Sequence, residues 1–306
     1  MLSEIIALGK RIYDTSNPRE VHRFLVFIGR SLLHTAAMRE LMDFFQQDAL
    51  RQRIFAKNPF PLEQVTRAFF YAGSTFQERM ALIRTHYTLL QEKLRPEWAE
   101  KLGAFDANYE IWKSADADID WNASLSFSPG QRKEGLMALD MRLDGQNLYQ
   151  MMFWLNKDKQ GEDALWIGAM QGPNGADARD IVKETTKRAH RYRTKNLILY
   201  MTMAAARSFG CRHIYAVSNE GYYANNHVRR DRKLKTDFGA FWEEPGGHVT
   251  ADKRFYEIPL VEPRKTMEEV PTRKRAVYRR RFAFQDDVDA QIAANLEKIQ
   301  KGTNEL

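Results

Sequence analysis

Apolar residues recur at intervals of three and four over roughly the first hundred positions, the spacing that places side chains on one face of an α-helix. Asn58, Pro59 and Pro61 interrupt this pattern near its middle. Ser74 stands where a helix would begin, and Gln77 follows three residues later, as in a capping box. The pattern predicts a helical lobe over residues 1–104. Its apolar positions include Phe24, Phe27, Ile28, Leu32, Leu41, Phe44, Phe45, Met80, Ile83, Tyr87 and Leu90.

From Phe105 onward the pattern changes to short runs in which aromatic and β-branched residues alternate with polar ones. This period of two is typical of strands with one buried face. The pair Asp144-Gly145 lies between two such runs and is a strong signal for a tight hairpin. The pattern therefore predicts consecutive antiparallel strands. These strands cover residues 109–113, 123–128, 136–143, 148–155 and 165–170.

Helical periodicity returns over residues 177–191 and 195–207, and Gly210 follows as a C-cap. We expect both helices to cover one side of the sheet. The run 213–218 is a predicted strand reached by this helical crossover, so it should lie parallel to the strand at 165–170. The remaining predicted elements are a helix at 238–243, a turn at Gly246-Gly247, a strand at 254–259 and a basic helix at 274–301.

These elements predict an α+β protein in three parts. A helical lobe (1–104) is followed by a mixed sheet with flanking helices (105–270) and a basic C-terminal helix (271–306). With 306 residues and 43% hydrophobic side chains, the chain is long enough to bury a full core.

Several classes of protein are disfavoured by composition. The single cysteine, Cys211, excludes an intramolecular disulfide framework and indicates a reducing compartment. The histidines are scattered without the spacing of a metal site, so we expect no metal. The first 13 residues lack the apolar run of a secretory signal, and no uncharged stretch reaches the roughly 20 residues of a spanning helix. We therefore expect a cytoplasmic protein that is not transmembrane.

The stretch 165–177 carries the clearest candidate for ligand binding. A short apolar run stops at a loop rich in Gly, Pro and Asn, and a helix follows. Glycine lets the backbone approach a ligand closely, and the free amides at a helix start carry partial positive charge. This geometry suits a phosphate or pyrophosphate, although a turn leaving a strand uses the same residue types. The candidate ligands in the loop are Gln171, Gly172, Asn174, Gly175 and Ala176.

The net charge of +7 is concentrated in two clusters. The cluster at 229–235 carries a net +4 and the cluster at 273–281 carries +6, so the rest of the chain carries −3. Such clusters attract the phosphates of nucleic acid, lipid headgroups or nucleotide cofactors, or they form solvated faces. The residues we expect to form an anion or nucleic-acid surface are Arg229, Arg230, Arg232, Lys233, Lys235, Arg275 and Arg279.

Segments 168–177, 235–247 and 271–282, together with 28–34 and 57–59, resemble the VirK/YbjX family of bacterial proteins. The similarity runs over nearly the whole chain. Members of this family occur in Gram-negative bacteria and are associated with virulence and with resistance to host antimicrobial peptides. The resemblance implies such a role in general terms, and the family has no agreed biochemical activity.

The order of elements around the loop is similar to that of the GNAT acyltransferases. That family holds the pyrophosphate of acyl-CoA with backbone amides of a Gln/Arg-x-x-Gly-x-Gly/Ala loop. Gln171 and Ala176 match its first and last positions, whereas Asn174 stands where glycine is expected. The helix at 195–207 is a further departure, since GNAT proteins usually have one helix here. The resemblance implies an acyl-CoA or acyl-carrier thioester held at 171–176, with Asn219 at the end of the neighbouring parallel strand.

Acyl transfer needs a base for the acceptor and an acid for the leaving thiol. Glu220 is the candidate base, and Tyr222 or Tyr223 is the candidate proton donor, because a phenol with a pKa near 10 suits a sulfur leaving group. The alternative is that Glu220 is a helix N-terminal acid and the tyrosines are packing residues.

The basic clusters support a different function, a non-catalytic regulatory module. Arg275, Arg279 and Phe282 would share one face of the last helix. Such a face suits RNA, a protein partner or an anionic membrane surface, which would make the protein peripheral to the inner membrane.

Overall fold

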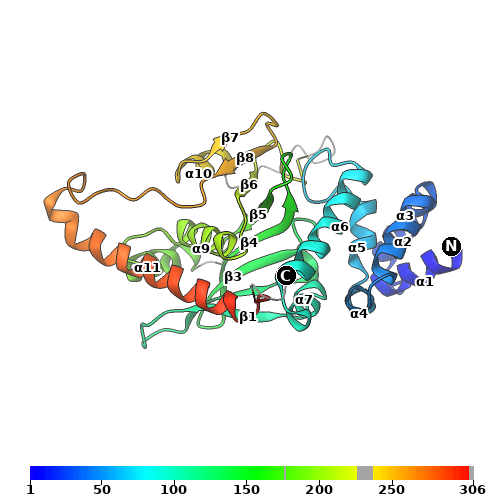
Figure 1. Cartoon of the computed structure of the whole chain (residues 1–306), viewed down its shortest axis with the longest axis horizontal. Helices are drawn as coiled ribbons and strands as arrows, with labels where there is room; N and C mark the ends of the chain where they lie inside the picture. Colours follow the sequence, from blue (N-terminus) through cyan, green and yellow to red (C-terminus); the bar gives the residue numbers. More distant parts are fainter. Residues whose placement is uncertain (176, 226–236, 303–306) are drawn as a thin grey trace.

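The computed structural model describes residues 1–175, 177–225 and 237–302. They form an α+β structure with helices flanking a mixed eight-stranded sheet, which confirms the predicted fold class (Figure 1). The first helices lie at one end of the long axis, and the start of the last helix lies at the other (Figure 1). Among the described helices, none combines the length and the apolar composition that a membrane crossing requires.

The N-terminal part of the chain is helical, as its periodicity predicts. The predicted start of α6 is wrong by one residue. Thr75 is the N-cap and forms the capping box with Glu78, because the hydroxyl of Ser74 instead donates to the carbonyl of Phe69 at 2.8 Å. The helices of this lobe are α1 (Leu2–Ile12), α2 (Pro18–Leu33), α3 (Thr35–Gln46), α4 (Ala49–Lys57), α5 (Phe60–Thr66), α6 (Phe76–Lys93) and α7 (Pro96–Gly103).

The sheet has the order β1-β2-β3-β4-β5-β6-β8-β7. All neighbouring strands are antiparallel except β5 and β6, whose parallel pairing the helical crossover predicts. Asp144 (φ 49°) and Gly145 (φ 74°) form the predicted hairpin between β3 and β4. The strands are β1 (Asn108–Lys113), β2 (Trp121–Ser126), β3 (Met137–Leu143), β4 (Gln146–Lys157), β5 (Asp163–Gln171), β6 (His213–Val217), β7 (His248–Val249) and β8 (Phe255–Ile258).

Helices after the sheet cover it unequally. Helix α9 (Thr194–Ser208) packs on β3 and β4 through a largely buried apolar surface. Helix α8 (Ala178–Arg188) buries only Thr185, since six of its eleven residues are charged, so the expectation that both helices cover the sheet is right for α9 alone. Helix α10 (Phe238–Glu243) precedes β7, and α11 (Arg275–Glu297) packs on α9 and β1.

Candidate functional site

Four polar side chains lie in register across four neighbouring strands. Ser124 on β2 pairs with Asp140 on β3, Asp140 pairs with Gln150 on β4, and Gln150 pairs with Gln171 on β5. Residues paired directly across strands share one face of the sheet, so these four side chains form a polar row. The row includes Asp140, which is only 3% exposed and therefore lies in the interior rather than on the surface.

Asp140 accepts hydrogen bonds from Gln150 of this row and from Ser126, two residues after Ser124 on β2. The hydroxyl of Ser126 donates to Oδ2, and Gln150 Nε2 donates to Oδ1 at 2.6 Å. Burial raises the pKa of Asp140 above its usual value, and these hydrogen bonds and the nearby Arg142 oppose that rise. Asp140 is thus a buried carboxyl whose proton affinity is higher than in water.

Glu134 lies over the end of β5 because the backbone before β3 crosses the sheet there very closely. A Cβ on Gly168 of β5 would lie 1.9 Å from the backbone oxygen of Glu134. A Cβ on Gly135 would lie 2.9 Å from the backbone nitrogen and oxygen of Phe153. Only glycine at these two positions permits the crossing.

The carboxylate of Glu134 joins two residues that the sequence singles out. Gln171 Nε2 donates to its Oε2 at 2.8 Å, and the hydroxyl of Tyr222 donates to its Oε1 at 2.7 Å. Glu134 is 6% exposed, and burial raises the pKa of its carboxyl while the two hydrogen bonds oppose the rise. The pKa of Tyr222 is also raised, first by burial and then by the charge of Glu134. We call Glu134, Gln171 and Tyr222 the carboxylate cluster.

The carboxylate cluster lies where the two parallel strands diverge. Strands β5 and β6 pair only from Ala164 with His213 to Ile167 with Ala216, although β5 continues to Gln171. After β6 the chain follows β8 instead, with the amide of Ser218 donating to the carbonyl of Arg254 at 2.8 Å. Glu134 therefore bridges the end of β5 and the segment after β6.

The helical lobe forms hydrogen bonds to the chain on either side of the point where β5 and β6 diverge. The amide of Phe70 donates to the carbonyl of Lys133, and the amide of Ala72 donates to the carbonyl of Gly221, each at 2.8 Å. Gln64 Nε2 donates to the carbonyl of Arg132 at 2.7 Å. The segment between α5 and α6 thus fixes the backbone next to Glu134 and next to Tyr222.

The predicted anion loop is exposed beside the carboxylate cluster. The backbone amides of Gly172, Asn174 and Gly175 donate no hydrogen bond to another described residue. With the start of β4 and Asp177, the loop lines a pocket of about 420 Å³, whose described lining contains no Lys or Arg. Ala176 lies outside the described residues. Free amides favour an anion, whereas the carboxylate of Asp177 disfavours one with several charges.

Asn219 and Glu220 lie apart from this loop. The side chain of Asn219 accepts from the amide of Phe238 at 2.8 Å and donates to Asp237 at 2.9 Å, so it anchors the start of α10. Glu220 is exposed and lines another pocket, of about 490 Å³, beside α10. Tyr223 packs against Tyr222, with ring centroids 5.0 Å apart. Of the predicted site residues, the structure brings Gln171 and Tyr222 together through Glu134.

The predicted basic surface is described only in part. Arg229, Arg230, Arg232, Lys233 and Lys235 lie outside the described residues. The two described members lie on α11. Arg275 begins this helix and donates to the carbonyl of Val270 at 3.1 Å, and Arg279 is exposed one turn later.

Two further features bear on chemistry. Cys211 is buried, as predicted, and burial raises the pKa of its thiol to about 12, which keeps the thiol protonated. In the described part of the chain, no group of three or more His, Cys, Asp and Glu side chains is arranged to hold a metal ion.

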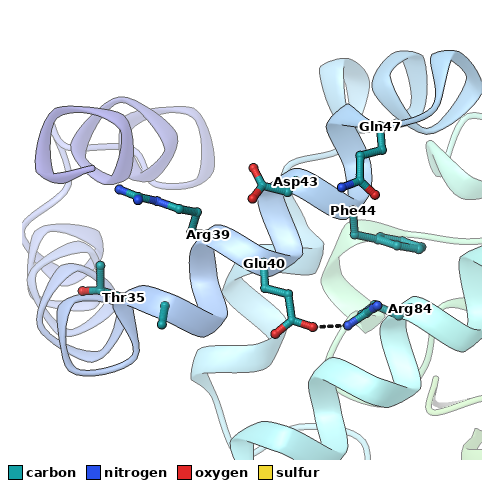
Figure 2. Close-up of a pocket in the computed structure, with 8 residues that line it drawn as sticks. Thr35, Arg39, Glu40, Asp43, Phe44, Gln47 and Arg84 are labelled. Carbon is teal, nitrogen blue, oxygen red and sulfur yellow. Dashed lines mark hydrogen bonds and ion pairs between the residues drawn. The ribbon is translucent and has the colours of Figure 1, made fainter.

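A pocket of about 590 Å³ on the helical lobe is built from α3 and α6 (Figure 2). Its charged lining is mixed: Arg39 and Arg84 lie with Glu40 and Asp43, and Arg84 pairs with Glu40. Phe44 forms its apolar side (Figure 2). Because these two positive and two negative side chains balance, the lining has no net charge that would select an ionic ligand.

The sequence analysis missed Glu134, Asp140 and Gln150. A signal for Asp140 was present, since it interrupts the apolar run Met-Ala-Leu-Asp-Met at a position that faces the interior. A charged residue in such a run is either paired or functional. Glu134 precedes a strand in an irregular segment, where periodicity carries no information.

Comparison with known proteins gives the family. Similar proteins include "Uncharacterized protein YbjX" of Escherichia coli (strain K12), 27% identical over 274 residues that cover 87% of this chain and 81% of that protein. An "Uncharacterized protein" of Haemophilus influenzae is 25% identical over 271 residues, 87% of each chain. "Membrane protein LapB" of Mannheimia haemolytica is 27% identical over 175 residues, 56% of this chain and 71% of that protein. No solved structure gives a significant match.

A family model described as "Protein of unknown function (DUF535)" matches residues 16–294. This match covers nearly all of the chain and agrees with the similarity to YbjX. The chain therefore belongs to the DUF535 family, which is the VirK/YbjX family that its sequence motifs resemble.

Proposed function

We propose that this protein is an acyltransferase, which moves an acyl group from a phosphopantetheine thioester to an amine or hydroxyl. The observation that carries the proposal is the buried carboxylate of Glu134, bridging Gln171 and Tyr222 where β5 and β6 diverge. A parallel pair that diverges within an otherwise antiparallel sheet, next to a loop with free amides, is the arrangement that the GNAT resemblance implies. The proposal requires an extended thioester arm to reach Glu134 from the pocket of the anion loop, which Gln171 lines.

The fit of the loop to such a substrate depends on its charge. The backbone amides of Gly172, Asn174 and Gly175, which donate to no other described residue, suit a single phosphate group. Asp177 and the absence of cations among the described lining residues favour a singly charged phosphodiester over a pyrophosphate. An acyl-carrier thioester therefore fits this loop better than acyl-CoA, and both share the phosphopantetheine arm.

Glu134 and Tyr222 can together move the protons of the reaction. Ionised Glu134 accepts the proton of the attacking amine or hydroxyl, and its raised pKa makes it a stronger base. Once Glu134 is neutral, the charge that raises the pKa of Tyr222 is gone, so the phenol becomes a better acid and protonates the departing thiolate. The proton on Glu134 then passes to Tyr222 along their 2.7 Å hydrogen bond, and both groups return to their starting states.

A thiol-release assay tests the proposal. Acyl-CoAs of several chain lengths and an acyl-carrier thioester are incubated with the protein and a panel of amines and alcohols, and free thiol is measured. We expect Glu134→Gln and Tyr222→Phe each to lower the rate about 100-fold or more. Tyr256→Phe, which removes a Tyr–Glu hydrogen bond elsewhere, is the matched control and should leave the rate within twofold. Equal rates in wild type and Glu134→Gln would refute the assignment of Glu134.

A second function, binding of an anionic partner without catalysis, is favoured by the start of α11. Its first turn holds Arg275 and no acidic residue, and Arg273 and Lys274 come just before it. Cations at a helix N-terminus oppose the helix dipole, so an anionic partner would relieve an unfavourable arrangement. One relative carries the name "Membrane protein LapB", which makes an anionic membrane surface a partner to test. This function would suit a cytoplasmic protein peripheral to the inner membrane.

Salt dependence separates the two functions. Binding of RNA or anionic vesicles that weakens steeply with salt and is lost in Arg275→Gln/Arg279→Gln would support the binding module. Binding unaffected by these substitutions would contradict it.

A further inference from the structure

Exposed apolar side chains are concentrated at the beginning of the chain. Six large hydrophobic side chains are exposed among the described residues, and four of them belong to the first 33 positions. Leu25 is 59% exposed, Leu32 42% and Leu33 81%, and all three lie on α2. The fourth, Leu2, begins the neighbouring α1. Isolated exposed leucines are common, but three on one short helix form a patch that needs an explanation.

These leucines share one side of α2. Leu25, Gly29, Leu32 and Leu33 follow one another at helical spacing, so they form one face, whereas the core contact of the helix is made by Phe27. A Cβ added to Gly29, in the middle of this face, would meet no atom within 4 Å. We call Leu25, Leu32 and Leu33 the leucine face; it has no partner among the described residues.

The leucine face is accessible at one end of the molecule. Helices α1 and α2 lie at the extremity of the long axis, away from the sheet and from α11 (Figure 1). Helix α2 packs on α1 and α5, and the leucine face is not used in that packing, as its exposure shows. A flat, extended surface can therefore reach it.

A row of arginines borders the leucine face. Arg19, Arg23 and Arg30 are separated by four and seven residues, so they line up along α2 next to Leu33. Arg23 pairs with Glu20, and Arg30 donates to the carbonyl of Thr66, while all three remain at the surface. Apolar residues flanked by cations on one helix are complementary to a bilayer, whose acyl region accepts leucine and whose phosphates accept arginine. In a two-fold dimer with antiparallel α2 helices, by contrast, the two arginine rows would lie along the same edge and repel each other.

We propose that the leucine face of α2 docks the protein on an anionic lipid bilayer, with α2 parallel to the membrane surface. The leucines enter the boundary between headgroups and acyl chains, and the arginine row contacts headgroup phosphates. This contact is independent of the polar row and of acyl transfer. It also differs from the basic surface of α11, which has no exposed leucines and lies at the other end of the molecule (Figure 1).

Vesicle co-sedimentation tests this inference with the full chain. The vesicles contain phosphatidylethanolamine with 30% phosphatidylglycerol, and neutral phosphatidylcholine vesicles serve for comparison. We expect Leu25→Gln/Leu33→Gln to lower the partition coefficient at least about tenfold, because two apolar side chains no longer enter the bilayer. Val249→Gln/Val261→Gln replaces two exposed apolar residues outside α2 and should leave partitioning within twofold. Thermal unfolding of both variants should match wild type, since the replaced side chains are exposed.

Three results would overturn the proposal. The first is wild-type partitioning that is no stronger on anionic than on neutral vesicles. The second is an unchanged partition coefficient in Leu25→Gln/Leu33→Gln. The third is a dimer, seen by sedimentation equilibrium in wild type and lost in this variant, which would assign the leucine face to a second copy of the chain.

Discussion

Replacing Tyr222 by Phe and Glu134 by Gln, singly and together, measures the contact at the centre of the carboxylate cluster. The Phe variant removes the hydroxyl that donates to Glu134 at 2.7 Å and leaves Gln171 as the remaining donor. A hydrogen bond to a charged group contributes about 1.5–3 kcal/mol to stability, and one to a neutral amide about 0.5–1.5 kcal/mol. The coupling free energy between the two positions should therefore be about 1–2 kcal/mol at pH 7.

The change of unfolding free energy with pH is a second, independent test of the contact between Glu134 and Tyr222. Because burial raises its pKa, Glu134 binds its proton more tightly in the folded than in the unfolded protein. Its contribution to stability is complete below about pH 4.5 and is lost as the pH rises through the pKa of the folded carboxyl. Glu134→Gln should remove this loss. Tyr222→Phe should enlarge it, because the hydrogen bond from Tyr222 lowers the pKa of Glu134.

Urea unfolding followed by tryptophan fluorescence, at pH 5 and pH 7, supplies the four free energies of the cycle. Tyr256→Phe with Glu243→Gln is the control, since their hydrogen bond is exposed and should couple by no more than about 0.5 kcal/mol. A coupling below about 0.3 kcal/mol between Glu134 and Tyr222 would mean that the two side chains do not interact, and the reasoning about the cluster would fail.

Three substitutions test separate local features of the fold. Gly168→Ala should destabilise the protein by about 2–4 kcal/mol in urea unfolding, because its Cβ would lie 1.9 Å from the backbone oxygen of Glu134; a neutral result would contradict the close crossing. Gly29→Ala, an exposed helical position with open space around it, should instead stabilise by up to about 1 kcal/mol. Burial lowers the pKa of His86 to about 3, and its Nδ1 accepts from the amide of Leu155 on β4. Stability due to neutral His86 should be complete above pH 6.5 and fall by about 1.4 kcal/mol per pH unit below it, and His86→Asn should remove this slope in acid unfolding. An unchanged slope would place the acid sensitivity elsewhere.

The elements were predictable from the sequence because their signals are local. Helical spacing, the Asp144-Gly145 hairpin and the glycine that ends α9 each depend on a few neighbouring residues. The helix ends as predicted, although Phe209 is its C-cap and Gly210 follows it with φ 71°. The exact start of α6 was not predictable from the sequence. Ser74 and Thr75 are equally good N-cap residues, and only the hydrogen bond from Ser74 to the carbonyl of Phe69 distinguishes them.

The site was less predictable because it depends on contacts between distant segments. Gln171 and Tyr222 were identified, but the group that joins them, Glu134, comes from an irregular segment placed by glycine contacts with β5. Asn219 was predicted beside a ligand from its place after β6, and nothing in the sequence indicated that its side chain also anchors α10 through Asp237 and Phe238. Helical spacing grouped Leu32 with Phe24 and Phe27 as packing positions, but Leu32 is exposed on the leucine face while Phe27 is buried.

Hydrogen exchange across the anion loop tests the central claim most directly. The protein is incubated with 4′-phosphopantetheine, with CoA or with an acyl-carrier thioester, and deuterium uptake is measured by mass spectrometry. We predict slower exchange in peptides containing Gly172, Asn174 and Gly175 and in the peptide containing Tyr222, because the loop amides bind phosphate and the arm enters beside Glu134. Unchanged exchange in these peptides with all three compounds would contradict thioester binding at this site.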